Sequence, residues 1–146
     1  MKKNHLETHD ITVSRVIRAS ASEVFDVWLD PKSPGGIWYG VEKVIVNPVV
    51  DGLFYHVVHH EGKSWAHYGR FIRLERGRAI EHTWVSEATR GLESIVTITL
   101  EARDGGTAVT LHHANIPDDE MGRGHKDGWT WYLDTLAQRF EKTAVR

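Results

Sequence analysis

The 146-residue chain has no cysteine, only four prolines and no strong excess of charge of either sign. The lack of cysteine excludes a disulfide framework and a thiol nucleophile. Eighteen Lys and Arg stand against twenty Asp and Glu, without the basic run that typically marks a nucleic-acid-binding surface. No apolar run approaches the roughly 20 residues of a membrane span, and the N-terminus lacks the apolar core of a signal peptide. We therefore expect a cytoplasmic protein that binds neither nucleic acid nor membrane.

The length corresponds to about one domain. Residues 1–10 are polar and aperiodic, so we expect a flexible lead-in there and a single domain over 11–146. Alternating apolar and polar residues predict a first strand from residue 11. Ser20 and Glu23 then have the spacing of a capping box at the start of a short helix.

Turn-forming pairs such as Asp51-Gly52 and Glu61-Gly62 punctuate the middle of the chain. The strands between these turns are predicted at about residues 41–47, 53–60, 64–75, 79–85, 92–103 and 107–115. Because no helix separates them, their spacing favours an antiparallel meander over a parallel sheet.

The last third of the chain carries a clear helical pattern. One stripe of the predicted helix contains His125, Trp129, Tyr132, Leu133, Leu136 and Phe140. A long helix packed on a curved sheet is the simplest way to bury this stripe, and such packing tends to leave a cavity. Gly128, which borders the stripe, indicates close packing or room for a ligand, because glycine in a helix costs about 1 kcal/mol relative to alanine.

Strand parity and helix phase assign side chains to this cavity. His113 is in phase with the apolar residues of its strand, and His82 is in phase with Trp84. Aromatic rings would give the cavity flat apolar walls suited to aromatic or lipid-like ligands. The predicted ligand-binding residues are Trp38, Tyr55, His82, Trp84, His113, His125 and Trp129.

Ten histidines raise the question of a metal site. The adjacent pairs His59-His60 and His112-His113 point to opposite faces of their strands, and the sequence contains no His-Glu-x-x-His motif. We expect no metal and no cofactor.

The role of two histidines is left open by the sequence. His113 is either a buried side chain hydrogen-bonded to a polar neighbour, or a ligand contact or general base. His125 either faces the same cavity or is an exposed residue of the helix. These two histidines are the candidate catalytic residues. On the opposite side of the same helix, Trp131 is predicted to face outward, where it suits a homodimer contact or a protein partner.

Several motifs occur in an order that resembles a known group over residues 11–141. They are Arg18-Ala19, Glu23-Val24-Phe25, Trp28 with Asp30-Pro31, Trp38, Gly52, Gly69, Thr83-Trp84, Gly106-Thr107, Leu111-His112-His113 and His125-x-x-Gly-Trp129. The chain resembles the SRPBCC or START-like superfamily, in particular the branch related to activators of the Hsp90 ATPase. This resemblance implies an α+β helix-grip fold like that of the birch-pollen allergen. Its element order is β-α-α-β6-α, with a curved antiparallel sheet wrapped around a long C-terminal helix.

Three functions follow as hypotheses. The first is binding of a small hydrophobic or aromatic molecule between the sheet and the C-terminal helix. The second is an enzyme resembling polyketide cyclases or hydrolases that uses a pocket histidine. The third, argued from the resemblance alone, is regulation of a chaperone ATPase. We favour the first, because no sequence-local acid accompanies the candidate histidines.

Overall fold

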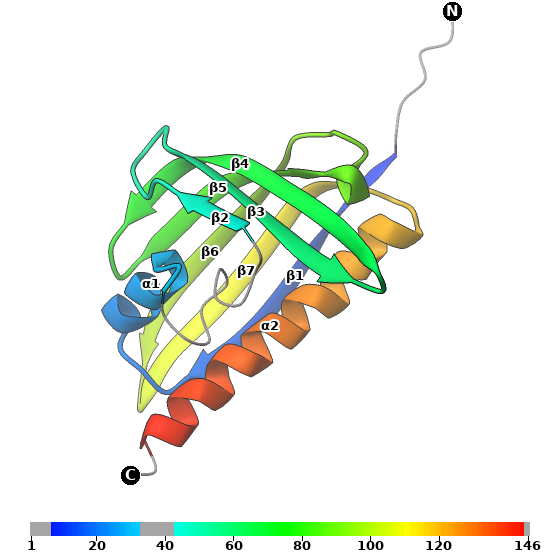
Figure 1. The fold of residues 1–146 in the computed structure, drawn as a ribbon. Helices are drawn as coiled ribbons and strands as arrows, with labels where there is room; N and C mark the ends of the chain where they lie inside the picture. The colour runs from blue at the N-terminus through cyan, green and yellow to red at the C-terminus, as the bar shows by residue number, and fades with distance from the viewer. Residues whose placement is uncertain (1–6, 33–42, 145–146) are drawn as a thin grey trace, which may run out of the picture.

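Seven strands form one antiparallel sheet in the computed structural model, which describes residues 7–32 and 43–144. The elements are β1 (Thr8–Ile17), α1 (Ala21–Leu29), β2 (Lys43–Val46), β3 (Leu53–His60), β4 (Lys63–Glu75), β5 (Ala79–Ser86), the 3-10 helix η1 (Glu87–Thr89), β6 (Ser94–Arg103), β7 (Gly106–Pro117) and α2 (Glu120–Ala144). The strand order is β1-β7-β6-β5-β4-β3-β2. The sheet curves, and α2 lies along β1 and β7 on its concave side (Figure 1). The predicted α+β helix-grip architecture is confirmed.

The first strand begins earlier than the alternation of side chains indicated. Thr8 pairs with Pro117 and His9 with Ile116, so the end of the expected lead-in is part of the sheet. The second short helix implied by the resemblance falls within residues 33–42, which lie outside the described residues.

Both helices begin at side chains that accept hydrogen bonds from free backbone N–H groups. The Ser20 hydroxyl accepts from the Glu23 N–H at 3.1 Å, and the Glu23 carboxylate accepts from the Ser20 N–H at 3.2 Å, which confirms the predicted capping box. A carboxylate oxygen of Asp119 accepts from the Gly122 N–H at 2.8 Å. This cap explains why α2 begins before the aromatic stripe that predicted it.

The core lies between the concave face of the sheet and the two helices. The predicted stripe of α2 is buried at Trp129, Leu133 and Leu136. Trp28 of α1 meets Tyr132 of α2 edge to face, with the ring centroids 5.0 Å apart. Aromatic contact therefore connects the two helices over the sheet. Among the described residues, no helix is long and apolar enough to cross a membrane.

Of the two explanations that the sequence offered for Gly128, close packing or room for a ligand, the structure contradicts close packing. It is exposed, and a Cβ added there would meet no other atom within 4 Å. Gly122 is the tightly packed glycine of α2, because a Cβ at this position would collide with the carbonyl oxygen of Pro117. The connection between β7 and α2, rather than a ligand pocket, therefore requires a glycine.

Replacement of two glycines in α2 by alanine should have opposite effects. Gly122→Ala is expected to destabilise the protein by more than about 2 kcal/mol, because the collision involves backbone that cannot move alone. Gly128→Ala is expected to stabilise it by about 1 kcal/mol through helix propensity. Urea unfolding measures both free energies, and Gly124→Ala, also in open space, is the matched control. Equal effects at Gly122 and Gly124 would contradict this account.

Candidate functional site

Four of the predicted ligand-binding residues meet where α2 crosses the sheet. Trp84 lies on β5, His113 on β7, and His125 and Trp129 on α2. The ring centroids of Trp84 and Trp129 are 5.1 Å apart, and those of His113 and His125 are also 5.1 Å apart. The structure thus brings together rings that were assigned to one cavity from separate segments.

A directed chain of hydrogen bonds runs through His113. The Trp129 indole N–H donates to Nδ1 of His113 at 3.0 Å. Since an indole nitrogen only donates, Nδ1 carries no proton. Nε2 therefore carries the proton and donates to the Ser94 hydroxyl at 2.8 Å, and that hydroxyl donates to the Trp84 carbonyl oxygen at 2.5 Å. This network assigns His113 as the neutral Nε2–H tautomer.

A second chain runs through His125 in the opposite direction. The Trp84 indole N–H donates to Nε2 of His125 at 3.3 Å, and Nδ1 lies 3.0 Å from the carbonyl oxygen of Gly122. His125 is therefore the neutral Nδ1–H tautomer. We call Trp84, Ser94, His113, His125 and Trp129 the Trp–His clasp, because its two indole–imidazole bonds join the sheet to the helix.

Both imidazoles of the clasp are held uncharged. Burial, with smaller contributions from neighbouring histidines, lowers the pKa of His113 to about 2. Burial also holds the pKa of His125 below its ordinary value of 6.5. All four ring nitrogens of these candidate catalytic residues have partners within the protein, so the geometry resembles that of structural histidines.

The rings continue beyond the clasp onto β3 and β4. His56 and His67 are stacked with their centroids 4.8 Å apart, and His67 lies 4.7 Å from Trp84. His82 is fully buried beside Phe54, and its Nδ1 donates to the Thr83 carbonyl oxygen at 2.8 Å. We call Phe54, His56, His67, His82, Trp84, His113, His125 and Trp129 the ring cluster.

Sequence reasoning did not assign His56, His67 or Ser94 to the site. The sequence signal that could have found two of them is the alternation of side chains along a strand. His56 shares a strand face with Phe54, and Ser94 shares one with Val96. Burial of Phe54 and His56, at 1% and 2% exposed, shows which register of β3 faces the core.

Tyr55 therefore lies on the other face of the sheet and does not join the predicted residues. It lines a hollow of about 470 Å³ with Ile45, Leu53, Tyr68 and Val85. The physical reason is the alternation of β3, in which Tyr55 stands between the buried Phe54 and His56. Trp38 lies outside the described residues.

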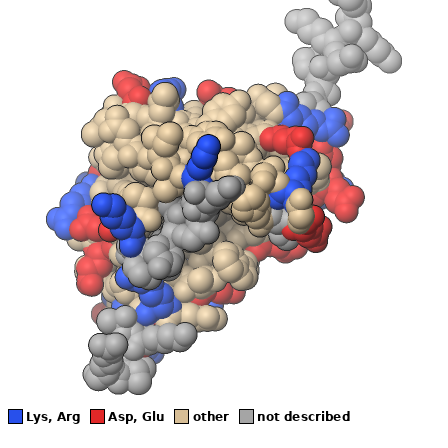
Figure 2. All heavy atoms as spheres, in the orientation of Figure 1, with Lys and Arg blue, Asp and Glu red and all other residues tan. Residues whose placement is uncertain are grey.

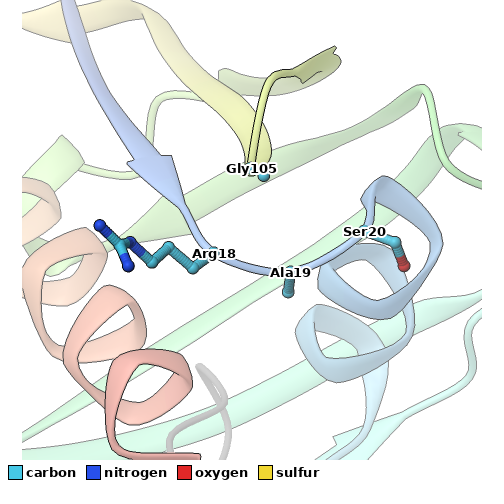
Figure 3. A pocket seen from close by; sticks show the side chains of 5 residues that line it. Arg18, Ala19, Ser20 and Gly105 are labelled. Atoms are coloured by element: carbon cyan, nitrogen blue, oxygen red, sulfur yellow. The ribbon is translucent and has the colours of Figure 1, made fainter. Parts of the chain in front are cut away.

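A second hollow, of about 250 Å³, lies at the junction of β1 and α1. Arg18, Ala19 and Ser20 line one side of it and Gly105 the other (Figure 3). It contains none of the predicted ligand-binding residues. The described residues also contain no group of three or more His, Asp or Glu side chains that could hold a metal ion.

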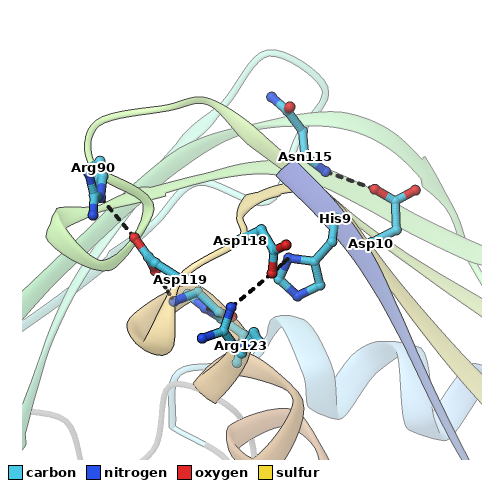
Figure 4. Close-up of polar contacts among 9 residues, drawn as sticks. His9, Asp10, Arg90, Asn115, Asp118, Asp119 and Arg123 are labelled. Atoms are coloured by element: carbon cyan, nitrogen blue, oxygen red, sulfur yellow. Dashed lines mark hydrogen bonds and ion pairs between the residues drawn. The ribbon is translucent and has the colours of Figure 1, made fainter. Parts of the chain in front are cut away.

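Ion pairs fasten the start of α2 to neighbouring elements (Figure 4). Arg90, which follows η1, donates to Asp119 at 2.8 Å, and Arg123 donates to Asp118 at 3.0 Å. Nδ1 of His9 on β1 lies 3.9 Å from Asp118. The loop over residues 86–91, which the sequence placed between two strands, is thereby attached to the helix end that carries His125.

Stability should fall as the pH drops below about 6.5. Burial lowers the pKa of His56 to about 3, of His82 to about 4 and of His113 to about 2, so at pH 5 only the unfolded state binds these protons. At pH 5 each of these histidines then lowers the free energy of unfolding by about 2 kcal/mol, and the three together lower it by about 6 kcal/mol. The whole free energy of unfolding of a typical domain is about 5–15 kcal/mol. Urea unfolding between pH 7.5 and 5 measures this loss.

Two variants separate buried from exposed histidines in that experiment. His82→Phe should make the stability less dependent on pH, whereas His112→Gln, on the outer face of β7, is the control. A free energy of unfolding that stays constant from pH 7.5 to 5 would contradict the presence of uncharged buried imidazoles.

Comparison with known proteins places this geometry in a family. The model of the family described as "Activator of Hsp90 ATPase homolog 1-like protein" matches residues 18–141. No curated protein matches the sequence.

Solved structures of several bacterial proteins are similar to the chain. Protein CV1439 from Chromobacterium violaceum is 26% identical, with a TM-score of 0.75 over 90% of this chain and 97% of that one. CalU16 from Micromonospora echinospora is 24% identical, with a TM-score of 0.68 over 95% and 80%. An AHSA1-like protein from Aeromonas hydrophila is 19% identical, with a TM-score of 0.71 over 94% and 96%. With a family model over most of its length, the chain belongs to the activator of Hsp90 ATPase homolog 1-like family within the SRPBCC helix-grip superfamily.

Proposed function

We propose that the protein binds a small, uncharged aromatic or otherwise apolar molecule against the ring cluster, beside the start of α2. The observation that carries this proposal is the ring cluster itself, which joins aromatic side chains and uncharged imidazoles from four strands and one helix. Such surfaces bind flat apolar molecules through burial of area and ring contacts.

The ring cluster extends beyond the strands against which α2 packs. The helix packs chiefly along β1, β7 and η1, whereas Phe54, His56 and His67 lie on β3 and β4. His67 and His125 are only partly buried, so the cluster extends toward the surface on both the sheet side and the helix side.

The charge state of the cluster favours an uncharged ligand. Burial lowers the pKa of His56 to about 3 and that of His67 to about 4, so these imidazoles are neutral near pH 7. A buried ionic ligand would lack a counter-charge among these rings and would lose its hydration. The fold of the family, which commonly binds hydrophobic ligands, supports the same class of ligand.

Other expectations remain predictions. A general base needs a free ring nitrogen, and those of His113 and His125 are already hydrogen-bonded. Trp131 is 67% exposed on the outer side of α2, which supports the expected contact with a partner or a second copy of the chain. No contact among the described residues specifically favours the enzyme or the chaperone regulator.

The proposal is tested with the uncharged probe N-phenyl-1-naphthylamine at pH 7.5. Binding should raise probe fluorescence by energy transfer from tryptophan, and saturation at about 100 times Kd should stabilise the fold by about 2.7 kcal/mol. His67→Glu should weaken the affinity at least tenfold, because it adds a charge to the ring cluster. Circular dichroism verifies that each variant is folded.

Tyr68→Glu is the matched control, since Tyr68 is the next residue of β4 but points to the outer face and lines the other hollow. It should leave the probe affinity unchanged. The proposal fails if the wild-type protein binds no probe, or if the two folded variants lose affinity equally.

A further inference from the structure

The Trp–His clasp crosses the interface between sheet and helix twice. An indole on the sheet, Trp84, donates to an imidazole on the helix, His125. An indole on the helix, Trp129, donates to an imidazole on the sheet, His113. The two bonds fix the orientation of both tryptophan rings of the ring cluster.

The clasp exists in only one charge state. A proton added to Nδ1 of His113 or Nε2 of His125 would place an N–H group against an indole N–H group, where neither can accept. Protonation therefore breaks the indole–imidazole hydrogen bond and leaves the buried indole N–H without an acceptor, which is unfavourable. Both indoles therefore require uncharged imidazoles opposite them.

We propose that His113 and His125 are positioning residues for the two indoles, and that protonation of His125 releases the bound molecule as the pH falls. This inference rests on the proposed function. Loss of the bond from Trp84 leaves its buried indole N–H without this acceptor and removes one constraint on the orientation of the ring, while the bond from His125 Nδ1–H to the Gly122 carbonyl oxygen is retained. The wall of the site is thereby altered before the fold is lost.

His125 protonates before His113 because of its surroundings. Burial lowers the pKa of His125, but the backbone of Gly122 and Met121 and, more weakly, the carboxylate of Asp119 just before the helix favour its charged form. His125 is also the less buried of the two histidines. His9 on β1 disfavours the charged form of His125, and His125 in turn lowers the pKa of His67 on β4 and of His113 on β7.

Apart from burial, the groups in the described part of the chain that lower the pKa of His113 are imidazoles. They come from β1, β5, β7 and α2, and are His9, His82, His112 and His125. A proton on any of them disfavours a second one on His113. Acidification therefore breaks the hydrogen bond from Trp84 on β5 to His125 on α2 before it breaks the one from Trp129 to His113.

The test measures the affinity for N-phenyl-1-naphthylamine between pH 7.5 and 5.5, with circular dichroism reporting the fold at each pH. Wild-type affinity should fall measurably, by up to about tenfold, while the protein remains folded, because a single group with a pKa below 6.5 cannot lower the affinity further at pH 5.5. In His125→Gln the side-chain amide can accept from Trp84 and donate to the Gly122 carbonyl oxygen, but it does not titrate. The ratio of its affinities at the two pH values should be about 1, because no proton can bind.

His112→Gln is the control for loss of a histidine, since His112 lies on the outer face beside His113 and bonds to Thr12. Its pH profile should match that of the wild type. A wild-type affinity that stays constant until unfolding, or a His125→Gln profile equal to that of the wild type, would overturn the inference and leave the proposed function standing. Absence of probe binding at pH 7.5 would overturn both.

Discussion

Two indole–imidazole hydrogen bonds run in opposite directions across the interface between α2 and the sheet and constrain the rings on both sides of it. Trp129 donates to His113, and Trp84 donates to His125. Because an indole nitrogen has no acceptor capacity, these bonds set both tautomers and require both histidines to be neutral. The buried Ser94 completes the arrangement by accepting from His113 and donating to the Trp84 carbonyl oxygen, so that the network ends on backbone.

Neutrality of the imidazoles links the chemistry of the site to its stability. Rings without charge give a surface on which an apolar molecule can be buried at little electrostatic cost. The same rings are held far from their ordinary pKa, so the protein gives up stability in acid. A site built from phenylalanine and leucine would bind apolar molecules without that sensitivity. The histidines thus add a dependence on pH that the helix-grip fold does not itself require.

The sequence predicted much of the fold because its periodic signals are regular where the structure is regular. Alternation in β6 and β7 placed His113 inside, and the stripe of α2 placed Trp129 on the sheet. The phase of β3 was ambiguous, since large residues occupy both registers, and only burial shows that Phe54 rather than Tyr55 faces the core. Tautomers and the role of Ser94 depend on contacts between distant strands, which no local pattern encodes.

Measurement of the imidazole ¹⁵N chemical shifts at pH 7.5 by long-range ¹⁵N–¹H NMR tests the central claim most directly. The account predicts that His113 is neutral with its proton on Nε2 and that His125 is neutral with its proton on Nδ1. The combination of an Nε2–H tautomer at His113 and an Nδ1–H tautomer at His125 is specific to the Trp–His clasp. A charged imidazole at either position, or the opposite tautomer at His113, would contradict it.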